Sequence, residues 1–249
     1  MSGHNKWANI KARKGSQDAK RGKMFTKTAK EIIISAKLGG GDPDGNARLR
    51  AAIQAGRAIN MPNENIKRAI ARGTGADGDT QIEEVIYEGF GPNGVAILVE
   101  GTTDNRNRTT GEIRHTFAKY GGNLGLQGCV ARMFQRQGQI TIPAEGLTEE
   151  KVFEAAIEAG ADDVQREDED FVIYTKVEEL HIVNDALAKA GLTASAVKAV
   201  YTPTMVTQLA GDHAKGLLKL MDALEDNDDV QDVWANFDID DKDLEDFEG

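Results

Sequence analysis

Nine of the first thirty residues are Lys or Arg, whereas Asp18 is the one acidic residue among them. Lysine side chains neutralise phosphate groups as point charges, and each contact releases counterions. Trp7, next to Lys6, offers an aromatic surface on which a nucleobase could stack. This stretch therefore predicts a nucleic-acid-binding arm. Its expected contact residues are Lys6, Trp7, Lys11, Arg13, Lys14, Lys20, Arg21, Lys23 and Lys27.

A second reading of the same arm is structural. Trp7 could anchor the arm against the body of the protein while the lysines only keep it solvated. We favour nucleic-acid binding, because no acidic partner for so basic an arm is evident nearby in the sequence.

A second basic group lies in the segment 103–109, which reads Thr-Asp-Asn-Arg-Asn-Arg-Thr. If Asp104 or Asn105 caps a helix there, Arg106 and Arg108 lie in its first turn. Cations at that end oppose the helix dipole by about 0.3–1 kcal/mol each. A phosphate docked between the guanidinium groups would offset this. Local pairing of Arg108 with Asp104 and Glu112 is the alternative, and the sequence leaves both open.

Signatures of catalysis are absent from the sequence. It has no phosphate-binding P-loop motif, and the glycine-rich stretch 122–128 lacks a strand–turn–helix context. The four histidines are dispersed, and Cys129 has no zinc-site spacing to any of them. A Cys129–His115 nucleophile pair remains open, but an inert buried cysteine is the favoured reading. We predict no catalytic, cofactor-binding or metal-binding residue, no enzyme activity and no small-molecule substrate.

The charge is distributed very unevenly along the 249 residues, whose formal net charge is -11. Residues 1–75 hold 16 Lys or Arg and 5 Asp or Glu, a net charge of +11, whereas residues 76–249 carry -22. Such asymmetry indicates a nucleic-acid-facing part joined to an acidic body. A single cysteine fits a reducing compartment. With no signal-peptide pattern and no apolar run of membrane length, we expect a cytoplasmic protein without membrane contact. A mitochondrial transit peptide is the weaker alternative.

The N-terminal third reads as helical. Residues 1–22 show no apolar stripe and predict an extended or partly ordered arm. Helical periodicity then predicts helices near 23–38, 46–59 and 62–73, with Gly73 as the last C-terminal cap. Together with the Gly-rich linker that follows, these make a predicted domain of residues 1–78.

The next segment changes to strand periodicity. Strands are expected at 85–88, 95–102 and 130–135, with a helix near 106–120. After Pro203 the pattern predicts a strand at 206–209, a helix near 213–226, a strand at 230–236 and a frayed acidic tail from Asp238. We predict one discontinuous α+β domain formed by residues 79–136 and 206–249.

Residues 137–205 repeat strand and helix patterns in the order β-α-β-β-α-β, the ferredoxin-like arrangement. Thr148 is the expected N-terminal cap of the first helix, which carries Glu149 and Glu150 in its first turn. The predicted fold class is thus α+β with three domains: a helical bundle bearing the basic arm, an α+β domain, and a ferredoxin-like domain inserted into it. Two domains in simple succession are the alternative to an insertion.

Several motifs together resemble those of the YebC/PmpR family. They are Gly3-His4-x-Lys6-Trp7-Ala8-x-Ile10, Asp18-Ala19-Lys20-Arg21-Gly22-Lys23-x-Phe25, Gly39-Gly40-Gly41-Asp42-Pro43, Asn46-x-Arg48-Leu49-Arg50, Tyr87-Glu88-Gly89-x-Gly91-Pro92, Asp104-Asn105-Arg106-Asn107-Arg108-Thr109, Gly121-Gly122-Asn123-Leu124-Gly125 and Leu224-Glu225-Asp226-x-Asp228-Asp229-Val230-Gln231. The resemblance spans essentially the whole chain. One departure is Cys129, where the family usually has Ser, and this weakens any role for the thiol.

The resemblance implies a three-domain, non-enzymatic regulator of gene expression. Bacterial members are described as probable transcriptional regulatory proteins that bind DNA. Other members act in translation, where they associate with the ribosome and relieve stalling at proline-rich stretches. A mitochondrial branch activates translation of cytochrome oxidase subunits. We therefore expect a DNA-binding transcriptional regulator, and the alternative is a translation factor that binds ribosomal RNA. We expect a monomer, although the sequence leaves the oligomeric state open.

Overall fold

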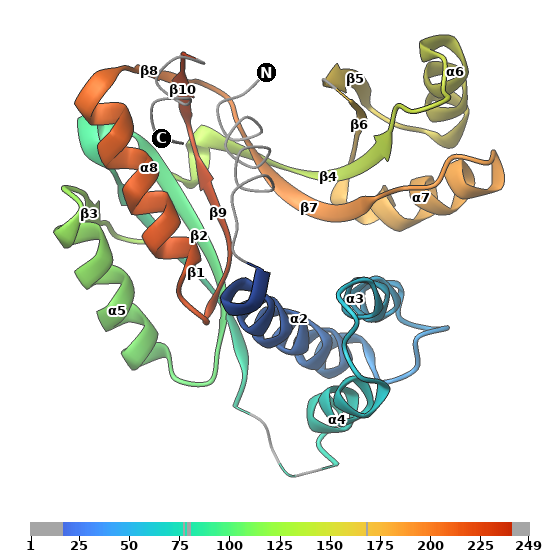
Figure 1. The fold of residues 1–249 in the computed structure, drawn as a ribbon, viewed down its shortest axis with the longest axis horizontal. Coiled ribbons are helices and arrows are strands. Elements are labelled where there is room, and N and C mark those ends of the chain that lie inside the picture. The colour runs from blue at the N-terminus through green and yellow to red at the C-terminus, as the bar shows by residue number, and fades with distance from the viewer. Residues whose placement is uncertain (1–16, 77, 79–80, 168, 241–249) are drawn as a thin grey trace. The chain divides into compact units, whose positions relative to one another are not determined.

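The computed structural model describes residues 17–76, 78, 81–167 and 169–240. The described chain divides into two compact units (Figure 1), one formed by Phe134–Thr204 and the other by the residues on either side of it. Both units combine helices with antiparallel sheets, as the α+β class predicts. The finer division into domains 1–78, 79–136 with 206–249, and 137–205 stays a prediction. None of the described helices is long and apolar enough to cross a membrane.

Three helices open the larger unit: α2 (Gln17–Gly39), α3 (Ala47–Ala58) and α4 (Asn63–Gly73). Their apolar faces form one core around Ile32, Leu49 and Ile66, each at most 5% exposed. Asn46 caps α3, because its side-chain oxygen accepts from the Leu49 N–H at 3.0 Å while its amide donates to two carbonyls at the end of α2. The three predicted helices are therefore confirmed.

Two details of this helical segment differ from expectation. The predicted arm of residues 1–22 is wrong in its last part, because α2 already begins at Gln17. Residues 17–22 have no apolar stripe, but the Gln, Lys and Arg residues among them have high helix propensity. They therefore extend α2 toward the N-terminus, past the part that packs on the core. Gly73 is the last helical residue and not the expected cap. A Cβ there would strike the backbone of Ile33 and lie 2.8 Å from the Ala36 Cβ, so Gly73 serves close packing of α4 on α2.

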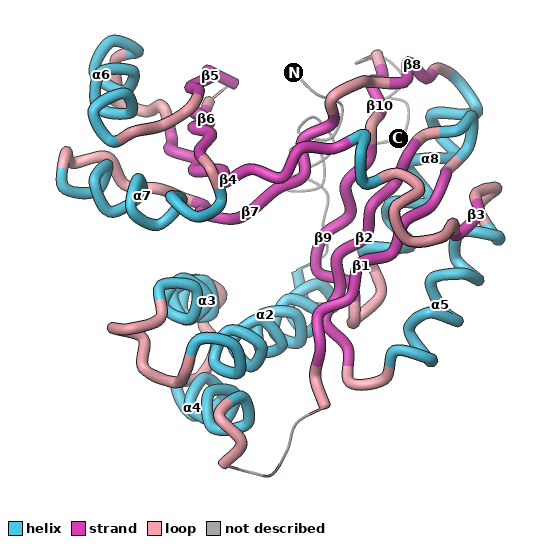
Figure 2. Tube along the Cα trace, turned by 180° about the vertical axis from the view of Figure 1, so that it is seen from behind, coloured by secondary structure: helices cyan, strands magenta, loops and turns pink. Residues whose placement is uncertain are grey.

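The larger unit also contains a four-stranded antiparallel sheet in the order β3-β1-β2-β9 (Figure 2). Its strands are β1 (Glu83–Phe90), β2 (Ala96–Thr103), β3 (Asn123–Leu124) and β9 (Val230–Ala235). Helices α5 (Arg106–Lys119) and α8 (Gly211–Glu225) share one core with the sheet, in which Ile97, Phe117 and Leu217 are fully buried. The β1–β2 hairpin and both helices confirm the sequence pattern.

The predicted strand 130–135 is wrong for its first four residues. Ala131–Met133 forms a 3-10 turn (η2), and Phe134 begins strand β4 (Phe134–Pro143) of the other unit. The physical reason is Glu88, a buried carboxylate on β1. The Glu88 carboxylate accepts the backbone N–H groups of Gly128, Val130 and Ala131 at 2.7–2.8 Å. The N–H groups of Val130 and Ala131 are therefore not available for hydrogen bonds to a neighbouring strand. The third sheet strand in this region is the two-residue β3.

The described C-terminal end contradicts the predicted fraying from Asp238. Strand β10 (Phe237–Ile239) pairs in parallel with β8 (Thr207–Leu209), and Ile239 is 1% exposed. Because Ile239 is buried, the ordered chain extends at least this far. The remaining acidic tail, 241–249, lies outside the described residues.

The unit Phe134–Thr204 has the predicted element order β-α-β-β-α-β. It contains β4, α6 (Glu149–Ala159), β5 (Asp163–Glu167), β6 (Asp170–Thr175), α7 (Leu180–Lys189) and β7 (Ala196–Pro203). The antiparallel sheet has the order β5-β6-β4-β7, and the buried faces of both helices join its core. Thr148 caps α6 by accepting the Lys151 N–H, as expected.

Candidate nucleic-acid interface

The predicted arm residues fall into two groups. Lys6, Trp7, Lys11, Arg13 and Lys14 lie outside the described residues. Lys20 and Arg21 belong to the first turns of α2, and Lys23 and Lys27 follow in the next two turns. The predicted contact residues that the structure describes therefore lie on a helix and not on an extended segment.

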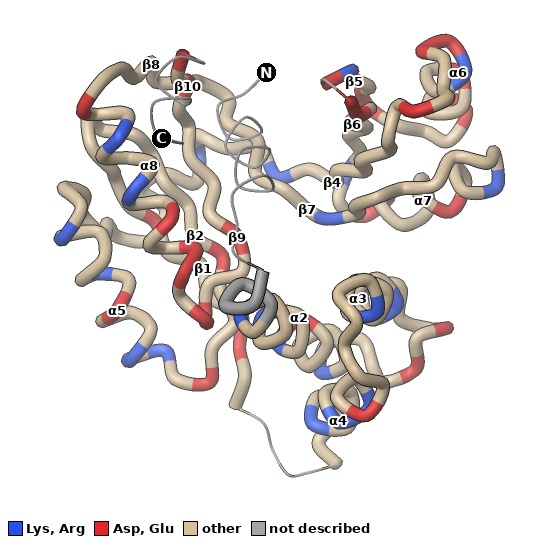
Figure 3. The backbone as a smooth tube through the Cα atoms, viewed as in Figure 1, with Lys and Arg blue, Asp and Glu red and all other residues tan. Residues whose placement is uncertain are grey.

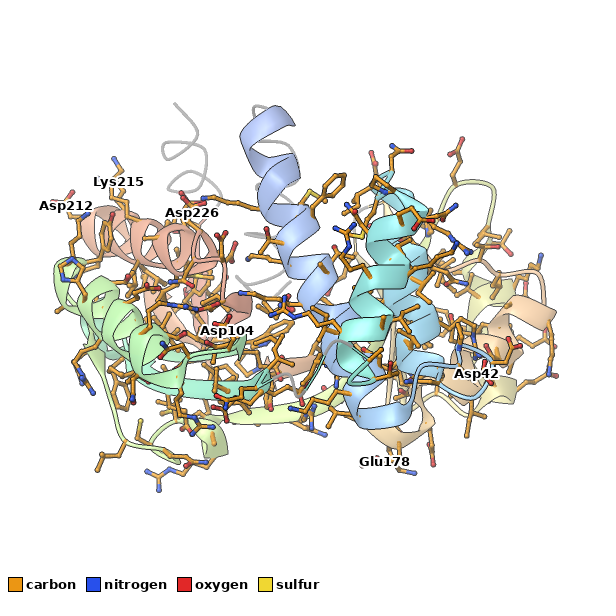
Figure 4. The ribbon with its side chains drawn as sticks, turned by 90° about the horizontal axis from the view of Figure 1, so that it is seen from below. Asp42, Asp104, Glu178, Asp212, Lys215 and Asp226 are labelled. Carbon is orange, nitrogen blue, oxygen red and sulfur yellow. The ribbon has the colours of Figure 1, made fainter. Side chains whose placement is uncertain are left out.

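Lysines on α2 contact the acidic turn that joins α8 to β9. The Lys23 ammonium lies 2.8 Å from a carboxylate oxygen of Asp226, a residue that is labelled in Figure 4. Lys27 donates to the Glu225 carbonyl at 2.7 Å. Lys30 donates to the Asp228 carbonyl at 2.8 Å and to the Asp229 carboxylate. No acidic partner of the basic stretch lies near it in the sequence, but α2 has one about 200 residues away, so this argument for nucleic-acid binding does not hold for α2.

Asp229 is the centre of this contact. Its side chain is 5% exposed, and one carboxylate oxygen accepts from Lys30. The other accepts from Arg108 at 2.7 Å and from the Thr109 hydroxyl at 2.6 Å, and Thr103 lies at 3.4 Å. One carboxylate thereby joins helix α2, the first turn of α5, the end of β2 and the turn before β9.

The protonation of Asp229 reflects these donors. Burial alone would raise its pKa, but the hydrogen bonds from Arg108, Lys30 and Thr109 outweigh burial and lower the pKa to about 2. Asp229 is therefore ionised at neutral pH, and its negative charge is matched by two cations. This carboxylate holds the helical segment on the sheet.

Arg48 makes a second link between the helices and the sheet. From α3 it donates to both carboxylate oxygens of Glu31 on α2, at 2.7 and 3.1 Å, and to Glu84 on β1 at 2.7 Å. Burial lowers the pKa of Arg48, but the hydrogen bonds to Glu31 and Glu84 raise it further than burial lowers it. Helices α2 and α3 are consequently fixed to the sheet by ion pairs at two separate places.

Arg106 and Arg108 are both paired with carboxylates. Arg106 binds Glu83 through two hydrogen bonds of 3.1 and 2.6 Å, and Arg108 contacts Asp104 at 3.0 Å and Glu112 at 3.9 Å besides Asp229. The hydrogen bond to Glu83 raises the pKa of Arg106, and that to Asp229 raises the pKa of Arg108. Asn105 caps α5, as one of the two expected caps. The local-pairing alternative is thus present in the structure.

Both guanidinium groups nevertheless remain accessible, with 59% of the Arg106 side chain and 45% of the Arg108 side chain exposed. Phosphate binding by these residues stays a prediction. The sequence pattern missed Glu83 and Asp229 as partners, because both are far from the arginines along the chain.

Two glycines of the glycine-rich stretch donate to Glu88. The Gly128 N–H, which a phosphate would need, donates to the Glu88 carboxylate, and the Gly125 N–H donates to the Glu88 carbonyl. Burial alone would raise the pKa of Glu88, but the backbone hydrogen bonds that it accepts outweigh burial and lower the pKa. Burial and the nearby Glu88 charge raise the pKa of the Cys129 thiol, which disfavours the reactive thiolate. Among the described residues, no group of His, Cys, Asp or Glu could hold a metal ion.

Comparison with known proteins identifies the family. A family model for the TACO1/YebC N-terminal domain matches residues 5–76, and one for the TACO1/YebC second and third domain matches residues 82–237. A probable transcriptional regulatory protein of Geobacter sulfurreducens is 53% identical over 245 residues, covering 98% of this chain and 99% of the relative. One from a Sulfurihydrogenibium species is 53% identical over 251 residues and covers both chains fully.

A solved structure agrees with the sequence comparison. The crystal structure of a conserved hypothetical protein from Aquifex aeolicus superposes with a TM-score of 0.84 at 50% identity, covering 90% of this chain and 92% of that one. The chain belongs to the TACO1/YebC family.

Proposed function

We propose that the protein is a nucleic-acid-binding regulator of gene expression, and specifically a DNA-binding transcriptional regulator that uses its basic N-terminal arm and helical segment. The observation that carries this proposal is the separation of charge, +11 in residues 1–75 against -22 in the rest of the chain. An acidic body repels a polyanion, so nucleic acid would approach through the basic third.

The names of the relatives support the transcriptional reading. Both relatives described above are called probable transcriptional regulatory proteins, and they match this chain over essentially its whole length. The described structure supports the helical segment as a firm base for the arm. Asp229 and Arg48 fix α2 and α3 to the sheet, so the chain entering from residue 16 continues into an anchored helix.

The predicted contacts divide by accessibility. Lys23 is 38% exposed in its side chain and its partner Asp226 is 63% exposed, so this pair is weak and a phosphate can replace the carboxylate. The Lys30 side chain is only 17% exposed and faces a buried carboxylate. We assign Lys23 to nucleic-acid contact, together with the arm, and Lys30 to the framework.

The experiment that tests this function is crosslinking of the tagged protein in cells, with bound DNA and RNA recovered together. The proposal expects reads focused on promoter DNA, and their loss from a variant lacking residues 2–22. Reads focused on ribosomal RNA, with co-sedimentation on ribosomes, would replace the transcriptional reading with the translational one. The proposal places the protein in the cytoplasm as a monomer without catalytic activity.

A further inference from the structure

Helices α3 and α4 carry a concentration of positive charge that lies outside the arm. Residues 47–73 contain one acidic residue, Glu64, and Figure 3 shows several Lys and Arg positions along both helices. The basic residues are Arg48, Arg50, Arg57, Lys67, Arg68 and Arg72. The segment therefore has a net charge of +5, although the protein as a whole is acidic.

Two of these six residues are used inside the fold. Arg48 bridges α2 and β1 through Glu31 and Glu84. Arg50 donates to the Pro43 carbonyl at 2.9 Å and stabilises the loop before α3. Neither guanidinium is available as a primary contact for a ligand.

The other four residues are exposed on the surface. Arg57 and Arg68 have no side-chain hydrogen bond or ion pair with any described residue. Lys67 approaches Glu64 at 3.3 Å, but both side chains are about three-quarters exposed, at 74% and 78%. Such an exposed pair contributes little to stability, and Lys67 can exchange Glu64 for another anion.

Packing on α2 fixes the direction in which α4 presents its charges. Ile66, Ala69 and Gly73 form the buried face of α4, and the missing side chain of Gly73 lets its backbone approach Ile33 closely. Arg68 and Arg72 are one turn apart and lie on the opposite side of the helix. A rigid helix thus holds two guanidinium groups outward.

Like charges one turn apart on a helix repel each other and destabilise it. No carboxylate among the described residues contacts Arg68 to offset this. The guanidinium fork matches a phosphate with two parallel hydrogen bonds, so phosphate groups are the chemically fitting partner.

We propose that Arg57, Lys67 and Arg68, with Arg72 beside them, form a second phosphate-contact surface, which we call the α3–α4 surface. Its ligand is the phosphate backbone of the nucleic acid that the arm engages. Contacts of this kind position the duplex and carry no base specificity. The inference rests on the proposed function and names the residues of α3 and α4 through which the helical segment contacts phosphate.

The test is a titration of the full-length protein with a fluorescent 20-base-pair DNA duplex across a range of salt concentrations, read by anisotropy. The variant replaces Arg57, Lys67 and Arg68 with Gln. The control replaces Lys151, Lys189 and Lys219 with Gln, which removes the same total charge at exposed sites on α6, α7 and α8. Circular dichroism and thermal melting check that each variant is folded.

The α3–α4 variant is expected to bind more weakly and to show a shallower dependence of log K on log salt, by roughly 0.9 for each lost contact. The control should keep the slope of the unaltered protein. If the α3–α4 variant also keeps that slope while the unaltered protein binds DNA, the inference is wrong and the proposed function is untouched. If the unaltered protein binds no nucleic acid, the proposed function and the inference both fail.

Discussion

Lys30 on α2 donates to the buried carboxylate of Asp229, a residue 199 positions later in the sequence. The same carboxylate accepts from Arg108 and Thr109 at the start of α5. A basic segment and an acidic body that look unrelated along the chain are therefore joined by a shared buried charge. This contact fixes the basic helix α2 on the acidic part of the larger unit.

Replacing Asp229 with Asn should destabilise the protein strongly. The change leaves Lys30 and Arg108 without their shared anion, at an expected loss of about 2–4 kcal/mol in the free energy of unfolding. Urea denaturation checks this, with the fluorescence of Trp234 as the signal. Trp234 lies on β9 and is 2% exposed. A Trp7→Phe background removes the second tryptophan.

Asp226→Asn is the matched control, since Asp226 is an exposed acid in the same turn and pairs with a lysine of the same helix. Its loss should change stability by less than about 1 kcal/mol. Equal effects of the two substitutions would contradict the central position given to Asp229.

The stability contributed by Asp229 should depend on pH in the acidic range. The folded-state pKa of about 2 lies below the ordinary value of 3.8, so folding favours the ionised form. The contribution is complete above about pH 4 and is lost as the pH falls toward 2. Urea midpoints measured from pH 5 to pH 2 should fall more steeply for the unaltered protein than for Asp229→Asn. Parallel curves would show that another group controls acid unfolding.

Replacing Glu88 with Gln should loosen the turn at residues 128–131. Gln offers one carbonyl oxygen where the carboxylate accepts three backbone N–H groups, and at least one of these donors loses its acceptor. The expected loss is about 1–3 kcal/mol. Amide hydrogen exchange should accelerate at Gly128, Val130 and Ala131. Exchange that is unchanged at these amides would rule out this role for Glu88.

Lys23 and Lys30 should behave differently when each is replaced with Gln. Lys23→Gln should change stability by less than about 1 kcal/mol, because its ion pair is exposed. It should weaken DNA binding and make the dependence of log K on log salt shallower by the amount expected for one phosphate contact. Lys30→Gln should destabilise the fold with a smaller effect on the salt slope. If Lys23→Gln destabilised the fold and Lys30→Gln reduced the salt dependence of binding, the roles assigned to the two lysines would be wrong.

Local sequence patterns predicted most of the elements, because periodicity and capping act over a few residues. Asn105 and Thr148 are caps as expected, and the β1–β2 hairpin lies where its apolar strands and Gly-rich turn placed it. The error at 130–135 has a non-local cause. The first four residues of this expected strand form a turn held by Glu88, some 40 residues earlier.

The candidate site was less predictable than the fold. Composition marked Lys23, Arg106 and Arg108 as basic residues, but it could not show that Asp226, Glu83 and Asp229 pair with them. Those partners come from distant parts of the chain and meet only in the folded structure. Arg57 and Arg68 were not expected as contacts, because spacing alone could not separate them from Arg48, which is used inside the fold.

The most direct test of the central claim is DNA and RNA binding by the protein with Lys6, Lys11, Lys14 and Lys20 replaced by Glu, measured by filter binding. Arm-mediated binding predicts that the variant loses affinity for both nucleic acids while its thermal unfolding midpoint stays near that of the unaltered protein. Unchanged affinity in a folded variant would contradict the claim that the arm carries nucleic-acid binding.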